Sequence, residues 1–381
     1  MSIQILNTSA KIIKNMYAVK NLKIVLKNFC CSKRICIFAL KNVAFMRYTY
    51  IYLLLFMLVL RIACFGQDIH FSQYYAVPLV FNPAATGAFD EDLRFSNNYR
   101  TQWSAIGVPY QTISVAIDAP VRFRGKSGLG VGVMFLHDKS GGTKLTANKF
   151  MISASYIYDI TKRHSVFAGL QGGYVDKHFT LDGITLPSQY NPETGMFDLN
   201  LPNNVTDMET SLGYFDMNAG VSYRGKFQKV EPTVSISVLH LNSPQETFCN
   251  IDTKLPPRML FSAEVGISCP QSWTVTPHLL TTFTKKTEEL LFGALAEHPI
   301  PTKVITSAFF GAGGRTSFSN FDAAMLTAGL TFYGITVAAS YDINLSKLMQ
   351  ATNARGAFEI SLIYKLKFAK KNFITLPCDR F

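Results

Sequence analysis

The feature that most limits how this chain can fold is a repeated alternation of apolar and polar side chains. In one run, Leu93, Phe95, Tyr99 and Trp103 alternate with residues that are mostly polar or charged. Successive side chains of a strand point to opposite faces, so such a run has one apolar and one polar face. An apolar exterior around a polar interior is typical of a membrane-spanning β-barrel.

The same alternation recurs along the chain and predicts about fourteen strands. They are expected near 92–104, 110–119, 128–138, 145–160, 164–177, 212–224, 229–241, 258–268, 273–285, 288–298, 303–315, 322–332, 335–345 and 355–366. Every second connection is short, whereas 178–211, 242–257 and 346–354 are longer. Short periplasmic turns, longer outer loops and an even number of strands are typical of bacterial barrels. We therefore predict an all-β fold, a transmembrane antiparallel β-barrel of about 14 strands.

The composition agrees with a lipid-facing surface. Charged residues make up 16% of the chain and aromatic residues 13%, and a low charged fraction is expected where much surface faces lipid. A soluble β-sandwich would leave too many Phe and Tyr in water. The formal net charge of +12 comes mainly from residues 1–66, which hold ten Lys or Arg and no acidic residue. Removing these ten from the 37 basic residues leaves 27 against 25 acidic ones, so nucleic acid is not an expected partner.

The first part of the chain is expected to be a leader. Met46 and Arg47 precede the apolar run 51–60, and Cys64 and Gly66 put small residues at the third and first positions before a cut at Gln67. This pattern predicts a signal peptide over 46–66 that is cleaved on export. Residues 1–45 are interpreted as a presequence, or as an extension upstream of the true start codon. The mature chain is then divided into a plug or docking segment (67–90), a barrel (91–366) and a periplasmic tail (367–381).

The sequence contains no motif for catalysis, metal binding or a cofactor. Four of the seven cysteines lie in the leader, and Cys249, Cys269 and Cys378 are far apart, without the spacing of metal ligands. Gly-x-Ser-x-Gly and His-Glu-x-x-His are absent. We therefore expect no enzyme activity, no cofactor and no metal site. One disulfide plus a free thiol is compatible with three cysteines, and its pairing stays open.

Several motifs, in order along the chain, resemble one known family. They are Gln-Asp-Ile-His-Phe-Ser-Gln-Tyr-Tyr at 67–75, Asn-Pro-Ala-Ala-Thr-Gly at 82–87, and the stretches 98–103, 138–142, 341–347, 356–364 and 376–381. Together they resemble the PorP/SprF family, outer-membrane proteins of the type IX secretion and gliding machinery of Bacteroidetes. Asp379 departs from the family's usual Cys-Pro-Arg-Phe ending. The resemblance implies a location in the outer membrane and partners among periplasmic ring proteins or secreted adhesins.

Two groups of residues are candidate sites. The first lies before the first strand and is expected to form a plug in the barrel, a periplasmic docking strip or a simple cap. Asn82 as a cap and Pro83 at the first helical position predict a helix start there. Its candidate residues are His70, Phe71, Ser72, Gln73, Tyr74, Tyr75, Pro78, Asn82, Pro83 and Gly87. The second group consists of charges on predicted inner faces, expected to pair across the lumen or else to gate it: Arg94, Arg100, Asp216, Arg224, Asp342 and Glu359.

From these observations we expect a component of the type IX secretion and gliding machinery that acts as a scaffold or partner in the export of surface proteins. The alternative is an outer-membrane channel or transporter for small solutes. The loop around 178–211, with Tyr190, Met196, Phe197 and Asp198, is a further candidate contact surface, or else a variable solvated loop.

Overall fold

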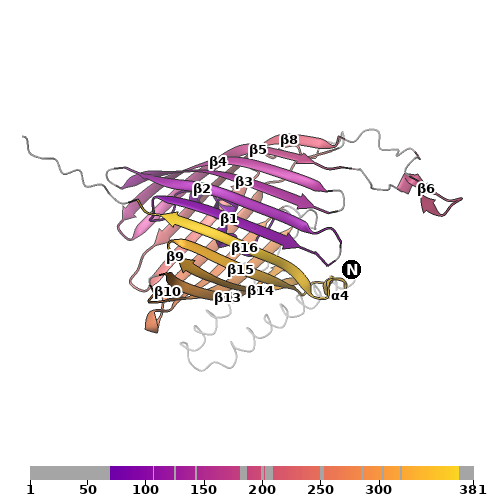
Figure 1. The fold of residues 1–381 in the computed structure, drawn as a ribbon. Helices are drawn as coiled ribbons and strands as arrows, with labels where there is room; N and C mark the ends of the chain where they lie inside the picture. The colour runs from indigo at the N-terminus through magenta and orange to yellow at the C-terminus, as the bar shows by residue number, and fades with distance from the viewer. Residues whose placement is uncertain are drawn as a thin grey trace, which may run out of the picture. The chain divides into compact units, whose positions relative to one another are not determined.

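The computed structural model describes residues 69–105, 107–123, 126–141, 144–180, 187–198, 201, 209–248, 253–284, 287–302, 304–317 and 320–368. In these residues fourteen strands pair side by side into a closed barrel, and every pairing is antiparallel. The predicted all-β barrel of about 14 strands is therefore confirmed. Figure 1 shows the first and last strands of the barrel lying next to each other, where the ring closes.

The barrel strands follow the alternating runs of the sequence closely. They are β1 (Leu93–Gln102), β2 (Tyr110–Arg122), β3 (Ser127–Ser140), β4 (Leu145–Thr161), β5 (His164–His178), β8 (Ser211–Gly225), β9 (Val230–Leu239), β10 (Arg258–Ser268), β11 (Thr274–Phe283), β12 (Glu288–Pro299), β13 (Ile305–Ser317), β14 (Asn320–Phe332), β15 (Ile335–Asn344) and β16 (Arg355–Leu366).

The two ends of the barrel differ in their connections. At the short-turn end, β4 joins β5 across two residues and β14 joins β15 across two residues. The first residue of β1 and the last residue of β16 also lie at this end, as register partners. The opposite, loop-rich end carries the connections 179–210 and 240–257, and α4 (Met349–Thr352) lies in the connection between β15 and β16. The predicted asymmetry of the ends is present, although β13 and β14 are also joined by only two residues at the loop-rich end.

Several small elements outside the barrel wall were not predicted from the alternation. A 3₁₀ turn, η3 (Pro187–Gln189), precedes a two-residue hairpin of β6 (Tyr190–Asn191) and β7 (Met196–Phe197) in the connection 179–210. The turn η4 (Pro270–Ser272) joins β10 to β11. None of the helices in the described part of the chain is long and apolar enough to cross a membrane.

The outer surface of the strands is apolar and the inner surface polar. Val131 is 46% exposed, Ile152 58% and Leu170 63%, although all three lie within strands. Their neighbours along the chain point inward, and polar residues such as Ser153, Ser155 and Gln171 are buried. A protein surrounded by water buries its apolar side chains and exposes its polar ones. The reverse distribution here indicates that the outer surface of the barrel faces lipid. A closed barrel also satisfies its strand hydrogen bonds without an edge.

Two expectations concern residues outside the described part of the chain. The leader and its cleavage before Gln67 lie there, as does the tail beyond residue 368. Of the three cysteines after the leader, Cys269 is described and is a free thiol, whereas Cys249 and Cys378 lie outside the described residues.

Candidate functional site

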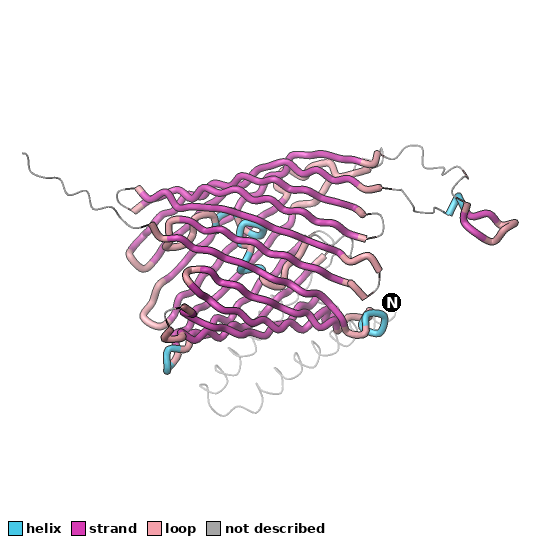
Figure 2. The backbone as a smooth tube through the Cα atoms, in the orientation of Figure 1, coloured by secondary structure: helices cyan, strands magenta, loops and turns pink. Residues whose placement is uncertain are grey.

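The segment 69–87, which we call the plug, fills part of the barrel lumen. It contains η1 (Tyr74–Ala76), α3 (Pro78–Phe81) and η2 (Pro83–Ala85), and Figure 2 shows these turns within the ring of strands. The turns η1 and α3 are short because the residues that follow them, Pro78 and Pro83, lack the N–H that would continue each turn. Asn82 caps η2 as predicted: its side-chain oxygen accepts a hydrogen bond from the Ala84 N–H at 2.9 Å.

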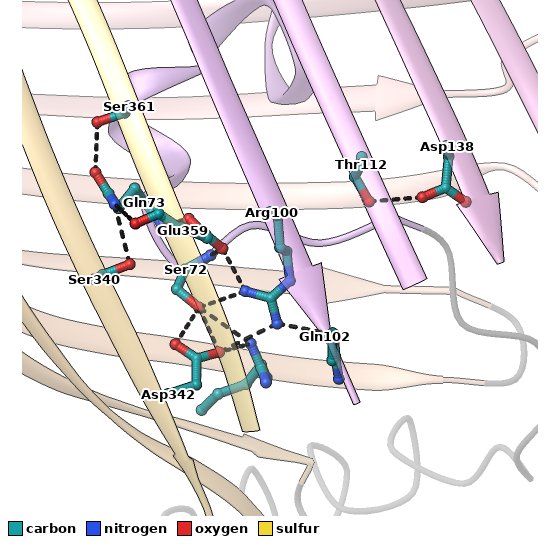
Figure 3. A network of polar contacts seen from close by, with 11 residues as sticks. Ser72, Gln73, Arg100, Gln102, Thr112, Asp138, Ser340, Asp342, Glu359 and Ser361 are labelled. Atoms are coloured by element: carbon teal, nitrogen blue, oxygen red, sulfur yellow. Dashed lines mark hydrogen bonds and ion pairs between the residues drawn. The ribbon is translucent and has the colours of Figure 1, made fainter. Parts of the chain in front are cut away.

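Near the loop-rich end, two carboxylates of the barrel wall bind the start of the plug. The Glu359 carboxylate accepts the backbone N–H groups of Ser72 at 2.6 Å and Gln73 at 2.9 Å. The Ser72 hydroxyl donates to Asp342 at 2.7 Å. Figure 3 shows these groups converging from β15, β16 and the plug. Because hydrogen bonds to ionised, buried carboxylates are among the strong ones, they fix the position of this turn in the lumen.

Two arginines neutralise the same carboxylates. Arg100, on β1, pairs with Glu359 and with Asp342, the latter at 3.1 Å, and donates to the Ser72 hydroxyl at 2.9 Å. Arg315, on β13, reaches Asp342 at 3.2 Å. Asp342, Glu359 and Arg100 are at most 2% exposed. The cluster therefore links three neighbouring barrel strands (β1, β16 and β15), nearby β13 and the plug, without access to water.

The Gln73 side chain completes this network on one side. Its amide N–H group donates to Ser340 at 3.0 Å, and its amide oxygen accepts from the Ser361 hydroxyl at 2.6 Å. Gln73 is completely buried. A buried amide without such partners would cost free energy on folding, so the serines of β15 and β16 make this position possible.

The middle of the plug is bound by polar residues from the opposite wall. The Gln171 amide donates to the Leu79 carbonyl oxygen at 3.1 Å, and the Ser237 hydroxyl to the Phe81 carbonyl oxygen at 2.6 Å. The Asn82 amide donates to the Ser222 hydroxyl at 2.8 Å. These barrel residues come from β5, β8 and β9, so the plug is held from both sides of the lumen.

Glycines of the wall let the plug backbone approach closely. A methyl group at Gly130 would lie 2.1 Å from the Thr86 carbonyl oxygen, and one at Gly169 would lie 2.4 Å from the Pro83 carbonyl group. Both distances are far shorter than a van der Waals contact. Thr86 is fixed at this place by Ser155, whose hydroxyl donates to the Thr86 carbonyl oxygen at 2.6 Å. Glycine is therefore required here for steric reasons, because the plug rests on the wall.

Apolar side chains of the plug pack against the few apolar residues of the inner wall. Phe71, Tyr74, Val77 and Phe81 form a buried cluster with residues of six strands: Leu136, Leu239, Leu260, Leu280, Leu291 and Met325. The Phe71 and Phe81 rings meet edge to face, with their centroids 6.3 Å apart. Burial of these rings removes apolar surface from water at about 25 cal/mol per Å², which adds to the polar anchors.

At the short-turn end, polar contacts bind the last residue of the plug and the segment that follows it. Asp118 accepts the Gly87 N–H at 2.7 Å and pairs with Arg94 at 2.8 Å. Asp90 pairs with Lys226, and with Arg224 at 3.6 Å. Partial burial of Asp90 raises its pKa, but the hydrogen bond from Lys226 and the nearby arginines outweigh this effect and hold the pKa below its ordinary value. Asp90 is therefore ionised at neutral pH.

The residues of the two candidate groups proposed from the sequence lie in or around the lumen. The plug contains His70, Phe71, Ser72, Gln73, Tyr74, Tyr75, Pro78, Asn82, Pro83 and Gly87. The segment 69–87 makes its described hydrogen bonds to wall residues such as Glu359, Gln171 and Ser237. Of the six predicted lumen charges, Arg100, Asp342 and Glu359 meet in one cluster. The other three pair elsewhere: Arg94 with Asp118, Asp216 with His240, and Arg224 with Asp90.

Some important residues were missed by the reasoning from sequence. Asp118 was missed although it falls on the polar side of the run 110–119, and the alternation of that run was sufficient to predict that it faces the lumen. Arg315 follows the sequence Gly-Ala-Gly-Gly, which obscures the two faces of β13. Within the described residues, no group of three or more His, Cys, Asp and Glu side chains is arranged to hold a metal ion.

Three solved structures with a similar fold are distant from this chain in sequence. The toluene transporter TbuX of Ralstonia pickettii is 11% identical to this chain with a TM-score of 0.46. The match covers 77% of this chain and 94% of TbuX. The toluene transporter TodX of Pseudomonas putida is 8% identical with a TM-score of 0.45. The match covers 79% of this chain and 98% of TodX. BamA of Haemophilus ducreyi lacking POTRA domains 1–3 is 7% identical with a TM-score of 0.38. The match covers 72% of this chain and 71% of that BamA chain. No match was found among curated proteins.

The sequence itself matches one protein family over most of its length. The model of the type IX secretion system membrane protein PorP/SprF aligns with residues 63–364, which include the plug and nearly all of the barrel. The match spans the motifs at 67–75 and 82–87 and the charges Arg100, Asp342 and Glu359. This chain belongs to the PorP/SprF family of type IX secretion system membrane proteins.

Proposed function

We propose that this protein is a closed scaffold of the type IX machinery in the outer membrane, and that it presents its short-turn end to partner proteins. The observation that carries the proposal is the plug, which is hydrogen-bonded to wall residues on opposite sides of the lumen. A lumen crossed by such a segment suits a protein that anchors others better than one that passes solutes.

The short-turn end is the proposed partner surface. In bacterial barrels, short turns and chain termini lie on the periplasmic side. Tyr333, in the turn between β14 and β15, is 67% exposed there, and Phe227, in the turn between β8 and β9, is 47% exposed. Exposed aromatic side chains are frequent anchors of protein interfaces. The partners best suited to this side are periplasmic ring proteins of the machine.

Electrical conductance tests whether the scaffold is closed. Purified protein is inserted into planar lipid bilayers and compared with a variant that lacks residues 69–87 but keeps the barrel. The proposal expects little ion current through the intact protein and stable open pores in the deletion variant. Steady conductance through the intact protein would instead favour the alternative, a channel for small solutes.

Recovery of partners from cross-linked cells tests the proposed surface. A double variant, Phe227→Ser with Tyr333→Ser, is expected to recover less of the ring proteins than the unchanged protein. Met196→Ser is the matched control, because Met196 is 71% exposed but lies in the connection 179–210 of the loop-rich end. Loss of partners in the Met196 variant alone would place the partner surface at the loop-rich end and favour secreted adhesins as partners.

A further inference from the structure

The short turns of the barrel differ in charge between the two halves of its rim. The turns between β2 and β3 (123–126), β4 and β5 (162–163), and β8 and β9 (226–229) contain no acidic residue and six basic ones: Arg124, Lys126, Lys162, Arg163, Lys226 and Lys229. The turns between β10 and β11, β12 and β13, and β14 and β15 contain one charged residue, Lys303. Because β2, β3, β4, β5, β8 and β9 follow one another around the ring, the three basic turns are neighbours. We call them the basic rim.

Backbone hydrogen bonds connect the turns of the basic rim. The Asp159 N–H donates to the Lys126 carbonyl oxygen at 2.7 Å, and the Lys226 N–H donates to the Arg163 carbonyl oxygen at 2.7 Å. The Lys226 side chain pairs with Asp90. Four other cations are exposed and form no ion pair with a described residue: Lys126, Lys162, Arg163 and Lys229. The basic rim therefore keeps a positive charge that the protein itself does not neutralise.

The lipid-facing side of β4 leads directly to these cations. Tyr156, Tyr158 and Ile160 are exposed on the same outer face of β4 as Ile152. The two tyrosine rings are stacked, with their centroids 6.4 Å apart. The Lys126 ammonium group donates to the Ile160 carbonyl oxygen at 3.4 Å. This cation therefore lies beside the end of the apolar face, and not below the lumen.

The length of β4 places these groups at the level of the lipid headgroups. Ile152 lies near the middle of β4, and Tyr158 follows six residues later. At about 3.3 Å per residue and a strand tilt of about 40°, these six residues rise by about 15 Å along the membrane normal. This is half the thickness of a hydrocarbon core of about 30 Å. Tyr158 then lies where barrels carry their aromatic girdle, and Lys126 and Lys162 lie just beyond it, beside the phosphate groups.

Charge and position together select the kind of ligand. A soluble acidic protein would approach the turns from the periplasm, whereas Lys126 lies beside residues that contact lipid. We propose that the basic rim binds the headgroups of anionic phospholipids in the periplasmic leaflet, with Lys126 and Lys162 at one phosphate. Each basic residue near a membrane surface adds about fivefold to such binding. The inference goes beyond the proposed function, because it requires neither a closed lumen nor a protein partner.

Native mass spectrometry of the full chain in detergent micelles tests the basic rim. The probes are dioleoyl phosphatidylglycerol and dioleoyl phosphatidylcholine, which have the same acyl chains and differ in net charge. Two cations at one phosphate predict that the unchanged protein binds phosphatidylglycerol about 25-fold more tightly. This preference should fall as the salt concentration rises, because salt screens exposed charges. In the double variant Lys126→Gln with Lys162→Gln, the two lipids should bind almost equally.

The matched control is Lys144→Gln with Lys347→Gln, which removes two exposed lysines from the loop-rich end. It should keep the full preference, and unheated gel mobility verifies that each variant is a folded barrel. Equal binding of both lipids by the unchanged protein overturns the proposal, as does an equal loss of preference in the control. The proposal also fails if the Lys126 and Lys162 variant keeps the lipid preference but recovers less of the ring proteins, since the basic rim would then bind protein. Conductance is measured separately, so the closed scaffold and the lipid site fail independently.

Discussion

Arg100 on the first barrel strand and Glu359 on the last are direct register partners, and their side chains form a buried ion pair across the seam where the barrel closes. The same Glu359 carboxylate accepts the backbone N–H groups of Ser72 and Gln73. One carboxylate therefore connects the two ends of the barrel sheet and the plug. Plug and seam are expected to respond together when this group is changed.

Replacing Arg100 by alanine should strongly destabilise the barrel. The substitution leaves Glu359 without its arginine and Asp342 with Arg315 alone, and removal of one partner of a buried pair costs about 3–5 kcal/mol. The temperature at which the unheated gel mobility is lost reports this change. Arg163→Ala, at an exposed position in the turn between β4 and β5, should leave that temperature almost unchanged. Equal transition temperatures for both variants would contradict the importance of the cluster.

Replacing Gly130 should displace the plug without changing a charge. A side chain there would overlap the Thr86 carbonyl oxygen, and overpacking of this kind costs about 1–3 kcal/mol. Gly130→Val is expected to raise conductance in planar bilayers, and Gly130→Ala to do so less. Gly266→Ala is the control, because a methyl group there would meet no atom closer than 3.8 Å. If the Gly130 variants stay as closed as the Gly266 variant, the plug is not held by this close contact.

A charge on the outer face should impair insertion into lipid. Ile152 lies near the middle of β4 and is 58% exposed. An arginine at the bilayer midplane of a barrel costs about 2–4 kcal/mol, so Ile152→Arg should fold in lipid vesicles with a lower yield. Met196→Arg introduces the same charge in the connection 179–210 and should fold normally. A normal yield for Ile152→Arg would mean that this face is not in contact with lipid.

Asp90 should make the stability of the plug's attachment depend on pH in the acidic range. Its pKa is held below the ordinary value of 3.8 by Lys226, Arg224 and Arg122. A depressed pKa in the folded state stabilises the protein above the unfolded-state pKa, and this contribution is lost as the pH falls through the lower folded-state pKa. The melting temperature of the unchanged protein should therefore exceed that of Asp90→Asn by a constant amount above about pH 4.5.

Below that range the difference between the two melting temperatures should shrink and disappear as Asp90 becomes protonated. The effect is small, because Asp90 is largely exposed and solvent screens its ion pairs. The pH series is best recorded at low ionic strength, where this screening is weakest. A difference that persists at pH 2 would show that the asparagine variant acts through something other than the lost charge.

Much of the barrel was predictable because a strand carries its own signal. Val131, Val133 and Phe135 occupy every second position of β3, with inward-facing residues between them. The structure places all three on the outside. Asp216 was assigned to the lumen in the same way and is buried there. The hairpin of β6 and β7 escaped prediction, since two-residue strands are too short to show alternation.

The partners of the lumen charges were not predictable from the same signal. The alternation predicts that Arg94 and Arg100 face inward. It does not predict that Arg94 pairs with Asp118 or that Arg100 pairs with Glu359. Which charges meet depends on the register between neighbouring strands and on where the plug lies. Both are set by contacts between distant parts of the chain.

By itself, the sequence determined the class of fold, the number of barrel strands and which face of each strand is apolar, because these follow from a repeat of two residues. Only the tertiary structure decided that the segment before β1 lies inside the barrel. Ser72 and Asp342 are 270 positions apart, and their hydrogen bond exists only once the ring has closed around the plug. The close approach of Thr86 to Gly130 arises in the same way, from packing that no local pattern encodes.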